Sequence, residues 1–509
     1  MGFLLAFPWR GRRGEWGSTG VIDRPQASRE EYGDQEGWLE RVRMSGPTST
    51  LADVSRFAPA SIVDALGGLG RSAFSGFRPS SLPRMQRRSF GLELTSTAFF
   101  AVTLSCIEAG TVAVYTKQTF EGLVAPGALN LVVAFLGASA ELANIVSFVW
   151  GPLSHGKPKV RFVNGLQVMV IALAATIAFL PETPTGLVLL AGVVFLARAG
   201  WSGIVTIRPT IWRANYPREA RAGIVGKLSV VQVVVVSIMG IVLGFALDSS
   251  RETFRILVTI GCVVSLFSVA TYGRLRVRRQ AKLLKAERED RPLAPWQAPL
   301  VVWRVLRKDP GYAQFMLWMF VLGFGNLMVM PITVIVLKER FGVGYLGGIL
   351  ATSVIPAVVQ IFAIPMWARL LDRSHIVKFR SIHSWAFVAA TAMFTLAAAV
   401  GSLPLIFVGA SILGIGFAGG SLAWNLGHTD FAPVSETSRY MATHVTLNGV
   451  RGMIAPFVSV LLYELVRGWG WNAGAVMYGT ALAVSVCGAA GFVWFRIKMG
   501  AGGARREAR

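Results

Sequence analysis

Long apolar stretches, separated by short polar connections, fill the chain from residue 92 to residue 495. Each stretch is close to the roughly 20 residues that a helix needs to cross a hydrocarbon layer of roughly 30 Å. A break rich in arginine and lysine, residues 274–310, divides the stretches into two sets of six. The pattern predicts an all-α polytopic membrane protein with twelve transmembrane helices in two six-helix bundles. We expect the spans at 92–116, 127–151, 162–180, 186–208, 223–248, 254–273, 313–337, 345–367, 381–400, 404–426, 441–463 and 473–495.

The connections between the spans alternate in charge along the chain. One set is basic and includes Lys157, Arg213, Arg373 and Arg380, whereas the other set is short and nearly neutral, at residues 181–185, 401–404 and 468–472. Positively charged loops of membrane proteins stay in the cytoplasm. We therefore expect an integral protein of the inner or plasma membrane with both termini cytoplasmic, which requires an even number of spans.

The segments outside the bundles are polar. Residues 1–88 are rich in Gly, Ser, Pro and Arg without periodicity, which predicts a disordered cytoplasmic tail. A translation start at Met44 or Met85 is an alternative interpretation of this segment.

A basic linker, residues 274–311, joins the two predicted bundles, and a second basic segment ends the chain. Within the linker, Leu300–Lys308 fits either an amphipathic helix on the anionic membrane surface or a solvated connection. The predicted organisation is two bundles at 89–273 and 312–496, with the tail at 497–509.

The composition agrees with a membrane protein. Of the 509 residues, 53% are hydrophobic and 15% are charged, whereas soluble domains carry about 25% charged residues. The net charge of +23 does not indicate nucleic-acid binding, because the basic residues flank the spans and no DNA- or RNA-binding motif occurs. Cys106, Cys262 and Cys487 each lie in an apolar span without a nearby partner, so we expect neither a disulfide nor a zinc site.

A short internal repeat relates the two predicted bundles. The second span ends at Trp150–His155 and the eighth ends at Trp367–Asp372. Both copies read Trp, small, any residue, Leu, any residue, and His or Asp, and both continue after four residues with Val and a base. Such internal repeats are typical of secondary transporters.

These motifs resemble those of the major facilitator superfamily. That family has Gly-x-Leu-small-Asp-Arg-x-Gly-Arg-Arg between spans two and three, and a weaker copy between spans eight and nine. Ala368–Arg373 keeps the acid–base core of the second copy, whereas His155 and Gly156 replace Asp and Arg in the first. Trp212–Arg221 resembles the family's loop between spans four and five. The resemblance covers about residues 90–498 and implies two bundles that rock about a midplane site, in a monomer.

The resemblance also implies that these loops form a cytoplasmic latch, in which acids and bases bond across the domain interface or to a helix end. A histidine at position 155 lacks the permanent charge of an aspartate and can change its charge near neutral pH. That position fits either a pH-sensitive latch or a degenerate motif with a polar cap. The expected latch residues are Gly151, His155, Lys159, Arg161, Asp372 and Arg373.

Ionisable side chains at membrane depth are costly and mark functional sites by default. Glu108, Glu141 and Arg198 lie inside the first, second and fourth spans. The resemblance implies that spans one, four, seven and ten line the central cavity, which favours Glu108, Arg198, Trp201, Asn326 and Trp424 as cavity residues. All candidates for substrate binding or proton coupling are Glu108, Glu141, Asn144, Arg198, Trp201, Asn326, Gln360, Trp424, His444, Asn448 and Arg451.

Two interpretations of these charges stay open. A glutamate could neutralise Arg198 or Arg451 and so hold helices together. Alternatively, a buried carboxylate gives up its proton when an arginine approaches, so that substrate and proton compete for the same arginine. Arginine can also bind an anionic substrate directly.

The eleventh span carries the longest polar stripe. His444, Asn448 and Arg451 follow one another at spacings of four and three residues, which places them on one helix face. Such a face cannot contact lipid, so we expect it in the bundle interior or in a water-filled cavity. His428 and Asp430 form a common sequence pair near a helix end, and we expect no metal site there.

We therefore expect a secondary active transporter of a small molecule or ion that works by alternating access, coupled to protons through the buried glutamates. No phosphate-binding loop of the Gly-x-x-x-x-Gly-Lys-Ser/Thr type occurs, which argues against ATP drive within the chain, and we expect no cofactor. A transporter-like receptor or scaffold is the main alternative, because the first latch motif is altered. A membrane-embedded transferase is disfavoured, since the loops lack clustered acids and histidines.

Overall fold

The structure, a computed structural model, describes residues 83–289, 298–433, 437–470 and 472–507. All of these residues belong to one compact unit, residues 75–509. Of the predicted disordered tail, residues 1–88, the part up to residue 82 lies outside the described residues. Residues 84–88 belong to the first helix, which begins at Arg84.

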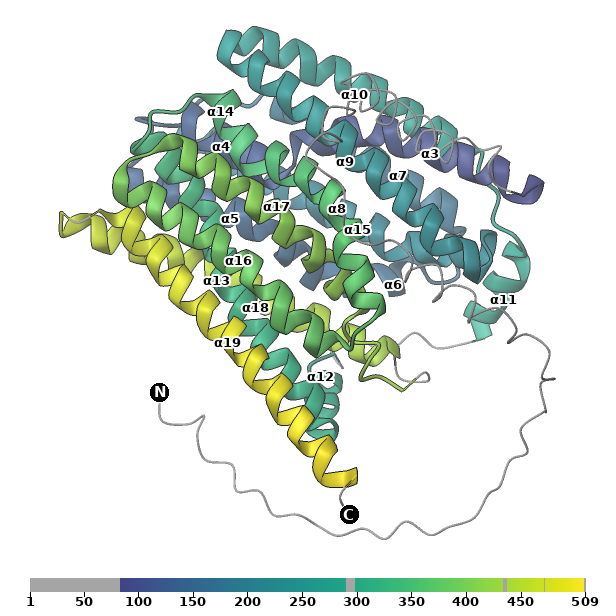
Figure 1. Ribbon diagram of the computed structural model, residues 1–509. Coiled ribbons are helices and arrows are strands. Elements are labelled where there is room, and N and C mark those ends of the chain that lie inside the picture. The colour runs from purple at the N-terminus through teal and green to yellow at the C-terminus, as the bar shows by residue number, and fades with distance from the viewer. Residues whose placement is uncertain (1–82, 290–297, 434–436, 471, 508–509) are drawn as a thin grey trace, which may run out of the picture. The chain divides into compact units, whose positions relative to one another are not determined.

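Helices make up almost all of the described chain (Figure 1). The first half contains α3 (Arg84–Cys106), α4 (Ala109–Thr119), α5 (Pro126–Val146), η3 (Ser147–Val149), α6 (Trp150–Ser154), α7 (Lys159–Ile177), α8 (Pro184–Asn215), α9 (Arg218–Ser249) and α10 (Arg251–Gly273). The linker contains α11 (Gln280–Glu289) and α12 (Ala298–Lys308). The second half contains α13 (Pro310–Glu339), α14 (Tyr345–Ile349), η5 (Leu350–Val354), α15 (Ile355–Asp372), α16 (Ile376–Val400), α17 (Leu403–Leu426), α18 (Thr437–Gly468) and α19 (Ala473–Glu507).

Twelve helical stretches of the described chain are long and apolar enough to cross a membrane. The predicted twelve-span, all-α fold is confirmed, and the observed ends differ from the predicted ends by several residues. In the fourth span, for example, α8 continues to Asn215 through Pro209, whereas the prediction stops at 208. Transmembrane helices tolerate an internal proline when neighbouring groups satisfy the freed carbonyl.

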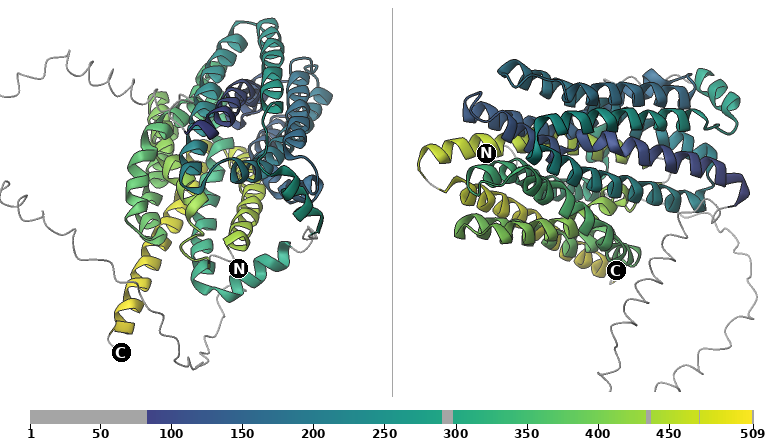
Figure 2. Two further views of the ribbon diagram at one scale, coloured as in Figure 1. Left: turned by 90° about the vertical axis from the view of Figure 1, so that its right-hand side faces the viewer. Right: turned by 90° about the horizontal axis from the view of Figure 1, so that it is seen from above.

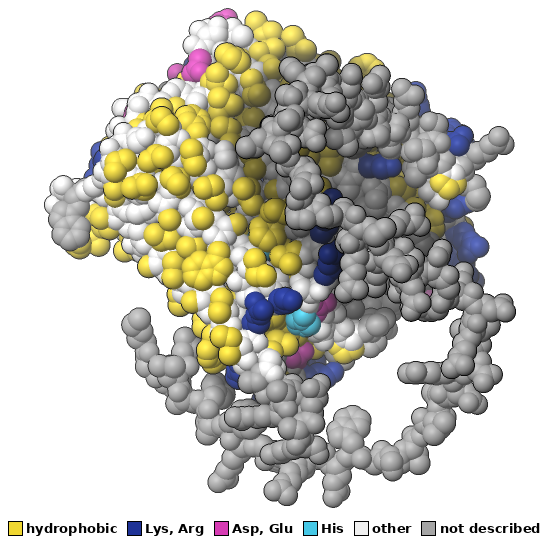
Figure 3. Space-filling view, viewed as in Figure 1, with side chains coloured by type: hydrophobic (Ala, Val, Ile, Leu, Met, Phe, Trp, Pro, Cys, Tyr) yellow, Lys and Arg dark blue, Asp and Glu magenta, His cyan; other side chains and the backbone are white. Residues whose placement is uncertain are grey.

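Large hydrophobic side chains cover the outside of the helices (Figure 3). Phe179, Val188, Phe245 and Phe362 each expose more than 60% of their surface. Such exposure is unfavourable in water, because the transfer of apolar surface out of water lowers the free energy. Lipid chains are therefore the natural neighbours of these side chains.

Each half forms its own helix bundle (Figures 1 and 2). In the first half, α3 packs against α9 and α10, and α7 packs against α8; in the second, α16 packs against α17 and α19, and α13 packs against α18 and α19. The halves meet where α5 packs against α18 and where α9 packs against α14, η5 and α15. We call the end with the connections 178–183 and 401–402 the short-loop end, and the opposite end, with 155–158, 216–217 and 373–375, the basic end.

Polar side chains define where several helices begin. Thr183 accepts a hydrogen bond from the Gly186 amide at the start of α8, and Asp309 accepts one from the Tyr312 amide at the start of α13. These N-caps satisfy amides that have no partner within the helix. They therefore set the register with which the following apolar residues enter the membrane.

The first and eighth spans are both interrupted, which the sequence pattern does not predict. Between α3 and α4, Glu108 adopts an extended backbone with φ −63° and ψ 140°. In the eighth span, η5 is a π-helix. Gly110 lets the two irregular segments touch, because a Cβ atom there would lie 2.1 Å from the Ser353 hydroxyl oxygen and 2.6 Å from that of Thr352.

The linker helix α12 packs against α13 and α18. It covers the predicted amphipathic segment Leu300–Lys308, with Val305 buried and Trp303 61% exposed. Contact with the membrane surface stays a prediction for this helix.

Glycines let α5 and α18 approach closely at the interface between the halves. A Cβ atom at Gly452 would lie 2.3 Å from Glu141 Cβ, and one at Gly449 would lie 2.3 Å from the Ile145 side chain. We expect Gly452→Ala to lower the free energy of unfolding by about 1–3 kcal/mol, the usual cost of overpacking. Thermal unfolding in detergent measures this.

Gly468→Ala is the matched control, because a Cβ atom at this position of the same helix meets nothing within 4 Å. Equal unfolding temperatures of the two variants would contradict the close approach of α5 and α18.

Candidate functional site

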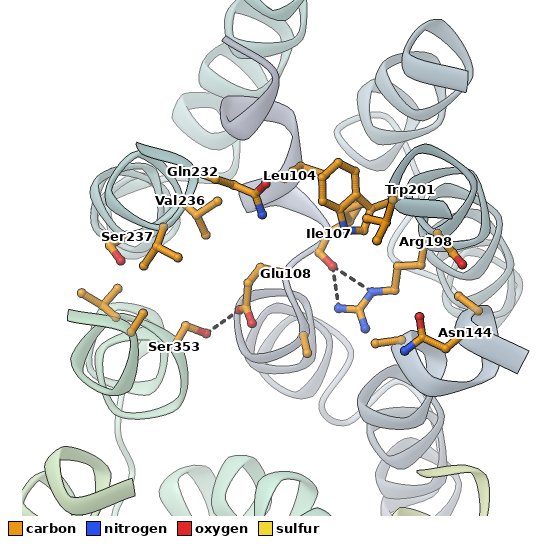
Figure 4. A pocket seen from close by; sticks show the side chains of 18 residues that line it. Leu104, Ile107, Glu108, Asn144, Arg198, Trp201, Gln232, Val236, Ser237 and Ser353 are labelled. Atoms are coloured by element: carbon orange, nitrogen blue, oxygen red, sulfur yellow. Dashed lines mark hydrogen bonds between the residues drawn. The ribbon is translucent and has the colours of Figure 1, made fainter. Parts of the chain in front are cut away.

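A cavity of about 450 Å³ lies at the interrupted first span (Figure 4). Its walls come from the α3–α4 break, α5, α8 and α9 of the first half and from η5 and α15 of the second. Small-molecule sites have volumes of roughly 300–1,000 Å³, so the cavity has a suitable size. Its lining residues are Leu104, Ile107, Glu108, Ala109, Ala140, Ala143, Asn144, Arg198, Trp201, Ser202, Val205, Gln232, Val233, Val236, Ser237, Ser353, Val354 and Ala357.

Arg198 binds the backbone at the break in the first span. Its Nε and Nη2 atoms donate to the Ile107 carbonyl oxygen at 2.9 and 2.5 Å, and its Nη1 atom donates to the Leu136 carbonyl oxygen at 3.3 Å. A helix end leaves carbonyls without amide partners, and the guanidinium group supplies donors for one of them. Arg198 is 6% exposed, so it supports the cavity wall from inside the bundle.

Glu108 lies on the other side of the same break. Its Oε2 atom accepts hydrogen bonds from the Thr111 amide at 2.9 Å and from the Ser353 hydroxyl at 2.5 Å. In Figure 4 it points toward Ser353, whereas Arg198 points toward Ile107. Among the described ion pairs, none joins Glu108 to Arg198. The carboxylate therefore caps α4 and bonds the first half to the second.

The rest of the cavity wall mixes apolar and amide groups. Trp201 and Val236 contribute apolar surface, and Asn144 and Gln232 contribute amides that can donate and accept hydrogen bonds. Ser353 was not among the predicted site residues, because its role depends on the unpredicted π-helix. The lining suits a solute with both apolar and polar groups.

A hydrogen-bonded network continues from the cavity wall into the second half. Asn144 Nδ2 donates to Glu141 Oε2 at 3.3 Å, and Asn448 Nδ2 donates to the same oxygen. Arg451 donates to Asn448 Oδ1 and to the Met319 carbonyl oxygen. The structure thus brings four predicted residues together, and Asn448 connects the Glu141 carboxylate of one half with the Arg451 guanidinium of the other.

A charged cluster at the short-loop end also joins the halves. Lys117, 2% exposed, donates to Glu339 Oε1 at 2.6 Å and to Asn130 Oδ1 at 2.8 Å. Asn130 Nδ2 donates to Glu464 Oε1 at 2.5 Å, and α18 supplies two further donors to Glu339. We call these residues, Lys117, Asn130, Glu339, Tyr463, Glu464 and Arg467, the short-loop cluster.

None of these residues was a predicted site residue, because Lys117 and Glu339 lie near span ends, where charges commonly flank the membrane. A usable signal exists in the sequence. The first span ends with Lys117 and the seventh ends with an acid, Glu339, between two bases, and a two-bundle fold brings these spans together.

A second missed carboxylate is Glu93 on α3, which is fully buried within the first half. It accepts hydrogen bonds from Trp212 Nε1 at 2.5 Å and from the Tyr216 hydroxyl at 3.0 Å. Burial beside this carboxylate raises the pKa of Tyr216, so the hydroxyl stays a donor. Nearby, Arg208 donates to Thr97 Oγ1 at 2.9 Å. These bonds lie within one bundle and indicate an internal structural role.

Besides Glu141, Asn448 and Arg451 of the network, four predicted candidates lie away from the cavity lining. Asn326 Oδ1 is buried without a hydrogen-bond partner among the described residues. Trp424 packs edge-on against His444, with ring centroids 5.9 Å apart. Gln360 is partly buried on α15. The cavity lies toward the first half, which explains why residues of spans seven and ten do not line it; substrate contact stays a prediction for all four.

Among the described contacts, none of the predicted latch residues joins the two halves. Lys159 donates to the Ser154 carbonyl oxygen at 2.7 Å and to Glu287 on the linker helix α11 at 2.8 Å. Arg161, Asp372 and Arg373 are exposed, and no described ion pair includes them. Of the other predicted latch residues, Gly151 lies in α6 and His155 directly follows it. A latch in another conformation stays a prediction.

The pair His428 and Asp430 serves the fold. Asp430 Oδ2 accepts a hydrogen bond from the Ile376 amide at 2.7 Å, at the start of α16, and burial lowers the pKa of His428. Within the described chain, no group of three or more His, Cys, Asp or Glu side chains is arranged to hold a metal ion.

Solved structures of several transporters share this fold. The POT family transporter PepTSo is 10% identical with a TM-score of 0.61, and the match covers 82% of this chain and 99% of that protein. A D-xylose-proton symporter is 13% identical with a TM-score of 0.60, covering 80% and 96%. The nucleoside transporter NupG is 16% identical with a TM-score of 0.58, covering 79% and 98%. Such low identities concern the fold alone.

A comparison with curated proteins finds no match. The family model for the major facilitator superfamily matches residues 89–456, which include eleven of the twelve spans in part or whole. Together with the twelve-span fold, this match confirms the predicted resemblance. The chain belongs to the major facilitator superfamily of membrane transporters.

Proposed function

We propose that the protein is a secondary active transporter that moves a small solute by alternating access, with the cavity around Glu108 and Arg198 as its substrate site. One observation carries this proposal: Glu108 lines the cavity and also bonds to Ser353 of the other half at 2.5 Å. A solute that competes for this carboxylate changes the contacts between the halves. A ligand can shift a conformational equilibrium only through such a difference in contacts.

Proton coupling is the energy source that the site favours. Glu108 is a partly exposed carboxylate at membrane depth, and Glu141 accepts bonds from both halves. Protonation of either carboxylate removes an acceptor from a bond between the halves. A D-xylose-proton symporter of similar fold uses the same ion, which agrees with this choice.

The basic end faces the cytoplasm in this proposal, because basic loops stay on that side. The short-loop cluster bonds the halves at the other end, whereas no described ion pair joins them at the basic end. This asymmetry supports a conformation that is closed on the outside.

The substrate can be found by a thermal-unfolding screen of the purified chain. The panel holds nucleosides, pentoses, short peptides, organic anions and hydrophobic cations, each at two pH values. A ligand at about 100 times its Kd stabilises the folded state by about 2.7 kcal/mol. We expect one chemical class to raise the unfolding temperature, and we expect Glu108→Gln to change the pH dependence of that shift.

Transport in proteoliposomes then tests coupling. We expect Glu108→Gln to abolish accumulation driven by a pH gradient while exchange of the same solute continues, because the variant still binds but no longer exchanges a proton. Unchanged accumulation by Glu108→Gln would exclude this carboxylate as the coupling group. Absence of both binding and transport in folded protein would favour a receptor or scaffold.

Arg198→Met tests the support of the cavity wall. The variant leaves the Ile107 carbonyl without its described donors, which costs about 1–3 kcal/mol for a buried acceptor. We expect a lower unfolding temperature, with part of the loss restored in Arg198→Lys because lysine can reach a carbonyl with one donor. Wild-type stability of Arg198→Met would show that the break needs no such support.

Lys117→Met tests whether the short-loop cluster closes the cavity. Breaking a buried ion pair costs about 3–5 kcal/mol, so the closed conformation should lose population. In a Cys487→Ala background, since Cys106 and Cys262 are buried, a cysteine placed by Ser237→Cys reports access to the cavity. We expect faster labelling by an impermeant maleimide from the short-loop side.

The control is Lys338→Met, which removes the ion pair between Lys338 and Glu121 at the same end. These side chains are 28% and 46% exposed, and exposed pairs contribute only about 0–1 kcal/mol. Equal labelling rates in Lys117→Met and Lys338→Met would contradict a gating role for the cluster.

A further inference from the structure

The second half holds two arginines in its interior, and the described carboxylate linked to them is Glu141 of the first half. Arg380 lies on α16 and is 4% exposed, and Arg451 lies on α18 with its guanidinium against Gly323 of α13. Arg451 reaches Glu141 through Asn448. The charged group that acts on Arg380 among the described residues is Arg451, which has the same sign. Among the described residues, no ion pair neutralises Arg380.

The prediction from sequence placed Arg380 in a basic connection, and the structure corrects this. Arg380 belongs to the second turn of α16, inside the bundle. Hydropathy alone could not separate it from its neighbour Lys378, which is exposed.

His383 binds Arg380 but supplies no negative charge. Its Nε2 atom lies 2.8 Å from the Gly416 carbonyl oxygen, which can only accept, so Nε2 carries the proton. The Nδ1 atom is then the acceptor for Arg380 Nη1 at 3.3 Å. The imidazole is neutral in this arrangement, and it orients the guanidinium group without neutralising it.

Several polar atoms of this region have no hydrogen-bond partner within the described chain. Arg380 Nε, Arg451 Nε and both ring nitrogens of His444 are buried without a hydrogen bond. His444 is 1% exposed, and the charges that act on it include those of Arg380 and Arg451. His444, Asn448 and Arg451 line a crevice together with Met319 that is too narrow for a water molecule in this conformation, so an anion enters only when these side chains move apart. A buried charge without a partner is costly, and so is a buried donor without an acceptor.

We propose that Arg380, Arg451 and His444 form a binding site for an oxyanion, the carboxylate or phosphate group of an anionic ligand. A guanidinium fork matches either group and can bind it through two parallel hydrogen bonds. One such anion supplies both the missing charge and the missing acceptors. This inference goes beyond the proposed function, because the site lies in the second half and shares no residue with the cavity lining.

The site is connected to the interface between the halves. An anion on Arg451 competes with Glu141, which reaches the same guanidinium through Asn448. Anion binding therefore draws the Arg451 guanidinium away from Asn448 and weakens the chain of bonds between α5 and α18, while Glu141 keeps its bond from Asn144. The ligand can be a co-transported ion or the charged group of the solute itself.

Binding is tested by thermal unfolding of the purified full chain with three oxyanion probes: benzoate, inorganic phosphate and a short-chain phosphatidylglycerol. These arms distinguish a carboxylated solute, free phosphate and a lipid headgroup, and benzamide is the neutral control for benzoate. We expect at least one oxyanion to raise the unfolding temperature and benzamide to have no effect. Arg380→Gln should abolish the shift, whereas Lys378→Gln, which removes an exposed charge two residues away, should retain it. No shift with any oxyanion, or an equal shift in Arg380→Gln, would overturn the proposal.

A second measurement does not depend on the choice of probe. In buffer with chloride as the only anion, Arg380→Met removes a buried charge that has no counter-ion, so we expect a higher unfolding temperature than in wild type. A lower unfolding temperature would mean that Arg380 has a structural partner and would overturn the site. The transport assays with Glu108→Gln report on the cavity independently, so either proposal can fail without the other.

Discussion

The bond between Arg198 and the Ile107 carbonyl lets the first span break inside a membrane. Hydrocarbon offers no hydrogen bonds, so an interrupted helix persists only where protein groups satisfy its free carbonyls. Because the helix is interrupted there, Glu108 leaves the helical conformation and becomes the N-cap of α4. The cavity, the contact with Ser353 and the approach of η5 all depend on this local departure from helical geometry.

The two halves are held together in two different ways. Where α5 meets α18, glycine permits backbone contact and the polar groups form a chain of hydrogen bonds rather than a direct ion pair. At the short-loop end, a lysine and a glutamate meet directly at 2.6 Å. The middle of the molecule therefore has polar bonds that can be exchanged at low cost, because an amide can rebind to another donor or acceptor. At the short-loop end, breaking the ion pair between Lys117 and Glu339 leaves an unpaired buried charge, so this bond is costly to exchange.

Sequence patterning was sufficient for the fold and for part of the site. Apolar length predicts twelve spans because lipid constrains every one of them in the same manner, and the cost of charge at membrane depth selects Glu108, Glu141, Arg198 and Arg451. The break at Glu108 and the π-helix were not predictable, since hydropathy is the same whether a span is continuous or interrupted. Arg380 was misassigned for a related reason: a charge one or two turns inside a span has the same local pattern as a charge in a loop.

The short-loop cluster draws its members from α4, α5, α13 and α18. Each member forms a hydrogen bond or ion pair with at least one other member. If one of these helices moves away, a charge or an acceptor on its neighbours loses its partner. In the proposed transport cycle, opening at this end would therefore break these bonds together rather than one at a time. Such a closure would limit the leak of ions and water between turnovers of the proposed cycle, and so would preserve the gradient on which that cycle depends.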